Sequence, residues 1–145
     1  MAGPDTPALA GTWTAVVTAD RAYYESIHAV SDLDTASISF PLSIHEWRFP
    51  LSGTPGTEVR IGRRSVSRGI EPEIDLTGPP RDPGVSRLHA ALIAGPDQTW
   101  SVVDLGSGNG IQVNGADVPP GEAVPLREGD RIHLGAWTLI TVSRG

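Results

Sequence analysis

Short runs of apolar and β-branched residues alternate with turn-forming residues along most of the chain. The runs recur at intervals of roughly 8 to 12 residues, and Gly, Pro, Asn and Asp occupy the gaps, which is typical of an antiparallel sandwich of short strands. The predicted strands cover residues 12–19, 47–51, 58–63, 74–76, 88–93, 100–104, 111–113, 123–126, 131–134 and 137–142. Asn114-Gly115 favours a tight hairpin turn, because both residues tolerate positive φ. We therefore expect an all-β fold, an antiparallel β-sandwich.

The beginning of the chain follows a different pattern. Residues 1–11 are mostly Pro, Gly, Ala and Thr, and are predicted to form a flexible lead or linker. After the strand at 12–19, Asp20 is placed to cap a short helix over residues 21–30. Several side chains make this segment too apolar to stay solvated, so we expect it to dock on the sandwich; they are Trp13, Val16, Val17, Tyr23, Tyr24 and Ile27.

Composition narrows the setting in which the protein works. The 17 Gly and 13 Pro fit a turn-rich fold, and the absence of Cys excludes disulfides and thiolate metal sites. No apolar run approaches the roughly 20 residues that span a bilayer, and the first ten residues do not resemble a secretory signal. We expect a cytoplasmic protein with no cofactor, no metal and no membrane insertion.

Charge argues against nucleic acid as a partner, because the net charge is −6. The distribution is uneven, since residues 60–90 hold six Arg against four acidic residues. All eleven basic residues are Arg, whose planar fork binds phosphate or carboxylate through two parallel hydrogen bonds. The middle of the chain is therefore the best candidate for an anion site.

Three segments at the ends of predicted strands carry the donors for such a site. Arg63 follows Gly62, whose missing side chain permits close approach; Ser86 and Arg87 precede the strand at 88–93; and Asn109 lies in a Gly-rich stretch. Loops at one end of a sandwich converge in space, so these donors can meet at one shallow site. A dianionic phosphate with three acceptor oxygens is the ligand that fits them best.

The order of these motifs resembles a known family, the forkhead-associated (FHA) domain, a β-sandwich that reads phosphothreonine in partner proteins. The matching motifs are Gly62-Arg63, Ser86-Arg87-Leu88-His89, Gly106-Ser107-Gly108-Asn109-Gly110 and Asn114-Gly115. The resemblance covers about residues 47–143, which predicts a lead at 1–11, an extension at 12–46 and an FHA domain at 47–145.

The resemblance also implies a role for each motif residue. The phosphate would be bound by Arg63 and Ser86, the peptide main chain would be held by Arg87 and Asn109, and the loops would be supported by Gly62, His89 and Asn114. Gly108 would also lie among the phosphopeptide-binding residues, but the family usually has Thr at this position, so the resemblance implies one phosphate contact fewer. The partner implied is a phosphothreonine-containing protein or peptide, with a Ser/Thr kinase or its substrates upstream and this chain as an adaptor.

The sequence fits other classes of function less well. A hydrolase is disfavoured because Leu105 replaces the first Gly of a G-x-S-x-G elbow around Ser107, and no metal-binding spacing joins the four His. A P-loop is excluded because no Lys follows the Gly-rich stretch. A β-sandwich that binds carbohydrate, or proteins without phosphate, stays the alternative. Arg60, Arg64 and Arg68 either select acidic residues beside the phosphothreonine or form a solvated face.

Overall fold

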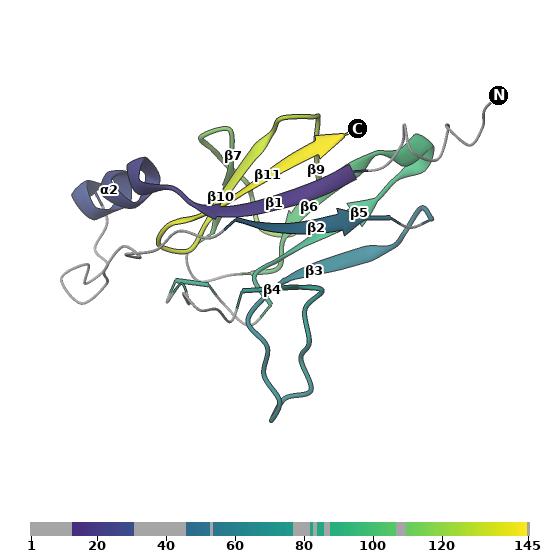
Figure 1. The fold of residues 1–145 in the computed structure, drawn as a ribbon, viewed down its shortest axis with the longest axis horizontal. Coiled ribbons are helices and arrows are strands. Elements are labelled where there is room, and N and C mark those ends of the chain that lie inside the picture. The colour runs from purple at the N-terminus through teal and green to yellow at the C-terminus, as the bar shows by residue number, and fades with distance from the viewer. Residues whose placement is uncertain are drawn as a thin grey trace.

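The computed structural model describes residues 13–30, 46–52, 54–76, 82, 84–85, 88–106 and 110–144. In these ranges the chain forms two β-sheets that pack around an apolar core, with a ten-residue helix beside them (Figure 1). The predicted all-β sandwich is confirmed. No helix in these ranges is long and apolar enough to cross a membrane.

The six-stranded sheet includes the first strand of the described chain as an inner member. Its spatial order is β2 (Trp47–Leu51), β1 (Trp13–Ala19), β11 (Thr138–Arg144), β10 (Arg131–Leu134), β7 (Ile111–Val113) and β8 (Ala116–Asp117). β1 pairs with β2 on one side and with β11 on the other, from Trp13 opposite Arg144 to Ala19 opposite Thr138. The strand predicted at 12–19 thus lies inside the sheet. This sheet combines a strand that precedes residue 46 with strands that follow it.

The five-stranded sheet has the spatial order β4 (Ile74–Asp75), β3 (Glu58–Gly62), β5 (Ala90–Ala94), β6 (Trp100–Asp104) and β9 (Val124–Pro125). Its pairs are antiparallel except β3 with β4, which are parallel. The connection between these two strands is long enough to bring the chain back, so that β4 runs in the same direction as β3. This connection projects away from the sandwich, and its two arms are joined by a β-bridge between Ser65 and Ile70 (Figure 1). This parallel pair departs from the expected antiparallel pattern.

Local sequence signals placed most elements within two residues of their observed bounds. The turn at Asn114-Gly115 is confirmed, with φ of 51° and 85°, and it joins β7 to β8. β8 itself was not predicted, nor was the 3-10 helix η2 (Pro96–Gln98), because both are too short to show a periodic pattern.

The core is filled by the inward side chains of both sheets. In β1 the alternation buries Trp13, Ala15 and Val17. In β10 Ile132 and Leu134 join the apolar core, and His133 between them is also buried. Facing side chains come from the other sheet, and the largest of those that are fully buried are Ile61, Ile74, Leu92 and Val102. β1 therefore contributes a full row of core residues.

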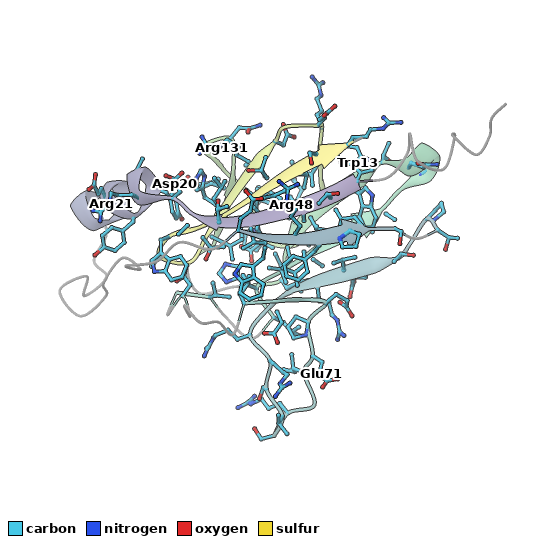
Figure 2. All side chains as sticks on the ribbon, in the orientation of Figure 1. Trp13, Asp20, Arg21, Arg48, Glu71 and Arg131 are labelled. Atoms are coloured by element: carbon cyan, nitrogen blue, oxygen red, sulfur yellow. The ribbon has the colours of Figure 1, made fainter. Side chains whose placement is uncertain are left out.

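Helix α2 (Arg21–Val30) is confirmed with its predicted cap. The Asp20 carboxylate accepts hydrogen bonds from the backbone N–H of Ala22 at 3.0 Å and of Tyr23 at 3.4 Å. Its other oxygen accepts from His133 Nε2 at 2.7 Å and from Arg131 at 3.1 Å, and Figure 2 shows Asp20 and Arg131 together at the helix start. The Tyr23 ring stacks on His133 with centroids 4.5 Å apart. These contacts fix the helix start on the outer face of β10.

Candidate functional site

One end of the sandwich gathers the three motif segments. β3 ends at Gly62, β5 begins at Ala90, β6 ends at Asp104 and β7 begins at Ile111. Because Ala90 lies opposite both Ile61 and Asp104, the ends of β3 and β6 and the start of β5 lie at the same end of the five-stranded sheet. The hydrogen bond between His89 and Gly110 brings the start of β7, in the other sheet, to this end. The convergence expected for Arg63, the loop before β5 and the Gly-rich stretch therefore holds for the residues that the structure describes.

Arg63 is the best-defined donor at this end. Its side chain is half-buried, and its Nε donates a hydrogen bond to the Val85 carbonyl at 2.5 Å, 22 residues further along the chain. No described acidic residue forms an ion pair with it. With Nε held, the edge formed by the two terminal nitrogens keeps the fork geometry that binds phosphate through two parallel hydrogen bonds.

Arg60 provides a contrast on the same strand. Its side chain is bound to the Glu73 carboxylate at 3.1 and 3.3 Å and to the Glu71 carbonyl at 3.0 Å. The hydrogen bond and the charge of Glu73 raise the pKa of Arg60, and the hydrogen bond from Arg60 lowers the pKa of Glu73. Arg60 already has an acidic partner within the chain, so the structure favours the solvated-face interpretation for this residue.

His89 joins the strand ends from inside. It is fully buried; its N–H donates to the Ile61 carbonyl at 2.9 Å, and its own carbonyl accepts from Leu105 at 3.1 Å. Nε2 lies 2.9 Å from the Gly110 carbonyl, and since a carbonyl can only accept, Nε2 carries the proton. Burial lowers the pKa of His89 although the bond to Gly110 opposes the shift. His89 thus joins the ends of β3 and β6 through its backbone, and its neutral imidazole holds the residue before β7.

The Gly-rich stretch is defined at both of its ends. The buried Asp104 carboxylate accepts from the Gly106 N–H at 3.0 Å, which begins the turn after β6. Gly106 and Gly110 have φ of 88° and 72°, a conformation that a residue with a Cβ rarely adopts. Four predicted binding residues lie outside the described residues, so their roles stay predictions; they are Ser86, Arg87, Gly108 and Asn109.

Asn114 lies away from these loops. It follows β7, so the length of that strand separates it from Gly110. Its side-chain oxygen accepts from the Arg131 N–H at 3.0 Å, and its amide nitrogen donates to Asp130 at 3.0 Å. Asn114 therefore ties the β7–β8 turn to the beginning of β10, and its contacts do not include the described residues around Arg63.

Sequence reasoning missed Asp82. This carboxylate is 1% exposed and accepts hydrogen bonds of 2.7 to 3.1 Å from the backbone N–H of Gly84, Ala136, Trp137 and Thr138 and from the Thr138 hydroxyl. It binds the segment before β5 to the turn between β10 and β11. The Asp-Pro-Gly sequence signals a turn, but no local pattern indicates that the carboxylate is buried.

The fold and the converging loops define a β-sandwich with a polar site built on the ends of its strands. No group of His, Cys, Asp and Glu in the described part of the chain could hold a metal ion. The FHA domain family matches residues 59–135, more than half of the chain, and the chain belongs to this family.

Relatives and solved structures agree with this assignment. The chain is 37% identical over 89 residues to an FHA domain-containing protein of Arabidopsis thaliana, a match that covers 61% of this chain and only 21% of that protein. It resembles the FHA domain of CT664 from Chlamydia trachomatis with a TM-score of 0.60 at 23% identity, over 92% of this chain and 98% of the other. A structure from work on phosphothreonine-dependent FHA domain interactions has a TM-score of 0.50 at 24% identity, over 90% and 97% of the two chains. Since residues 47–145 make up about two thirds of the chain, these structural matches extend into the first 46 residues.

Proposed function

We propose that this chain is a phosphothreonine-dependent protein–protein interaction module. The observation that carries the proposal is the Arg63 guanidinium, held through Nε by the Val85 carbonyl at the end of the sandwich where the motif segments converge. Its two terminal nitrogens match the oxygens of a phosphate monoester. The proposed activity is binding alone, with no catalytic step.

The remaining motif residues complete the proposed site. In this proposal Ser86 binds the phosphate through its hydroxyl, and Arg87 and Asn109 hold the peptide main chain near it. Gly108 lacks the hydroxyl that the family's usual Thr offers to the phosphate. His89 supports the loops through its bonds to Gly110 and Ile61. Gly62 and Asn114 are assigned supporting roles, and the contacts of Asn114 restrict its support to the β7–β8 turn and β10.

The proposed partner is a protein phosphorylated on threonine by a Ser/Thr kinase, and the proposed role is that of an adaptor in kinase signalling in the cytoplasm. Membership in the FHA family supports this assignment, as does the structural resemblance to a domain studied for phosphothreonine-dependent interactions. The chain spans about a fifth of the length of its Arabidopsis relative, so the activity of any larger assembly is a separate question.

The test compares Arg63 with Arg60, which lies three residues earlier in the chain and has different contacts. Arg63→Ala is expected to weaken phosphothreonine peptide binding by about 2 to 5 kcal/mol, because it leaves the phosphate unpaired in the site. Arg60→Ala removes the same charge three residues earlier, within β3, but the partner of Arg60 is Glu73, so binding should change by less than about 1 kcal/mol. Calorimetry with a degenerate phosphothreonine peptide mixture, and with its unphosphorylated counterpart, measures both.

Three results would contradict the proposal. Equal affinity for phosphorylated and unphosphorylated peptides would assign a phosphate-independent interaction. Equal losses in the two variants would reduce the role of Arg63 to general electrostatic attraction. Binding of a carbohydrate array in place of peptides would support the alternative class of β-sandwich.

A further inference from the structure

The described residues shortly before β5 are Asp82, Gly84 and Val85, and they are called the segment before β5. The buried Asp82 carboxylate binds this segment to the turn between β10 and β11 in the opposite sheet. We propose that Asp82 is a positioning residue for the phosphate site: it fixes the Val85 carbonyl, and that carbonyl orients the Arg63 guanidinium. Asp82 contacts no ligand group in this scheme, because its own carboxylate is turned into the protein. The inference rests on the proposed function and adds a residue that acts through Arg63.

The first link joins Asp82 to the turn between β10 and β11. Oδ2 accepts from the N–H of Ala136, Trp137 and Thr138 and from the Thr138 hydroxyl at 2.7 to 3.1 Å, and Oδ1 accepts from Ala136 and Gly84 at 2.8 Å. Three consecutive backbone donors aimed at one group form a cradle suited to a carboxylate, which only accepts hydrogen bonds when ionised. An amide in this place would direct its N–H₂ group at these donors.

The second link is the close contact between the two backbones around the carboxylate. A Cβ on Gly84 would lie 2.7 Å from the Ala136 nitrogen, and a Cβ on Gly135 would lie 2.5 Å from Asp82 Oδ2. Gly135 also has a φ of 65°, which favours glycine. The segment and the turn therefore meet without space for another atom, so the segment cannot shift while the cradle is intact.

The third link runs from Asp82 to Arg63. The Val85 N–H donates to the Asp82 carbonyl at 3.2 Å, and the Val85 side chain is buried in the core at 1% exposure. The Val85 carbonyl then accepts the Arg63 Nε hydrogen bond. Because the guanidinium is planar, fixing Nε also fixes the direction of the two terminal nitrogens that would meet the phosphate.

The experiment disturbs the cradle in two ways and compares both with a variant of similar stability. Asp82→Asn replaces the acceptor, and Gly84→Ala pushes the segment off the turn while the carboxylate stays. Val142→Ala is the control: Val142 is fully buried in β11 opposite Ala15, and this substitution lowers stability without touching the cradle. Each full-length variant is assayed at a temperature where it is folded, for phosphothreonine peptide affinity and for the hydrogen-exchange rate of the Arg63 Nε–H by NMR.

We expect both cradle variants to lose about tenfold or more in affinity and to speed exchange of the Arg63 Nε–H, while the control changes neither. If one cradle variant fails to fold, the other still tests the inference. Affinity and exchange equal to those of the control, with binding by the unaltered chain intact, would overturn the role of Asp82 alone. If the unaltered chain does not bind phosphothreonine peptides, the proposed function fails together with this inference.

Discussion

Removing β1 should unfold the protein. The perturbation is a chain that begins at residue 47, compared with one that begins at residue 13. The longer chain lacks the predicted flexible lead at 1–11 and Thr12, so it should match the full chain in stability. The shorter one loses an inner strand of the six-stranded sheet together with its pairing to β2 and β11. It also loses helix α2 and the contacts of Asp20 with β10.

The magnitude follows from the buried side chains of β1. Trp13, Ala15 and Val17 are at most 5% exposed, and Trp13 also donates its indole N–H to the Gln98 carbonyl at 2.7 Å. Truncating a buried Trp costs about 3 to 5 kcal/mol, and burial of a Val side chain contributes about 1.5 to 3 kcal/mol. The loss of about 5 to 8 kcal/mol is comparable to the total stability of a typical domain, which is about 5 to 15 kcal/mol.

Denaturant titration followed by circular dichroism measures this difference. The chain from residue 13 should show a cooperative transition, and the chain from residue 47 should show none, or a much lower midpoint. A single substitution, Trp13→Ala, should fall between them. If the chain from residue 47 unfolds at the same denaturant concentration as the longer one, then β1 is dispensable and the assignment of its side chains to the core is wrong.

Two further predictions concern titrating groups. Burial lowers the pKa of His89, so as the pH falls this imidazole is protonated in the unfolded chain before it is protonated in the folded one. The free energy of unfolding should therefore keep its full value above about pH 6.5, the ordinary His value, and decrease below it. In unfolding titrations between about pH 7.5 and 5, His89→Gln should reduce this decrease. Burial alone would raise the pKa of Asp20, but the hydrogen bonds from His133, Tyr23 and Ala22 together outweigh it and lower the pKa. Asp20→Ala should therefore cost about 1 to 2 kcal/mol at pH 7, and this difference should shrink as the pH falls from the ordinary Asp value of 3.8 through the lower pKa of the folded state. A difference that does not change as the pH falls below 3.8 would contradict the role assigned to the ionised carboxylate.

Elements encoded by neighbouring residues were predictable from the sequence. The strand at Trp100–Asp104 shows apolar residues bounded by turn signals, and α2 begins where Asp20 supplies a cap. The Asn114-Gly115 turn was predictable because its backbone conformation depends on those two residues. In each case the residues that determine the local structure lie within a few positions of one another.

Features that depend on distant partners were not predictable in this way. The position of β1 is set by pairing with β11, more than a hundred residues further along, and nothing near Trp13 specifies that register. The sequence around Asp82 indicates only a turn, because all of its donors except the Gly84 N–H come from residues 54 to 56 positions away. For the candidate site, the motifs indicated Arg63, but the hydrogen bond to Val85 that orients it could be found only in three dimensions.

The pairing of β1 with β11 determines how the module responds to force. β1 begins and β11 ends at the same end of the sheet, with Trp13 opposite Arg144. β3, which Arg63 follows, ends at the opposite end of the sandwich (Figure 1). Tension between Trp13 and Arg144 would act perpendicular to β1 and β11 and break the hydrogen bonds between them one after another. Tension between a ligand held near Arg63 and either end would instead run along the strands and strain many hydrogen bonds at once. The same domain should therefore yield easily when stretched between its own ends and resist when it is pulled through a bound partner.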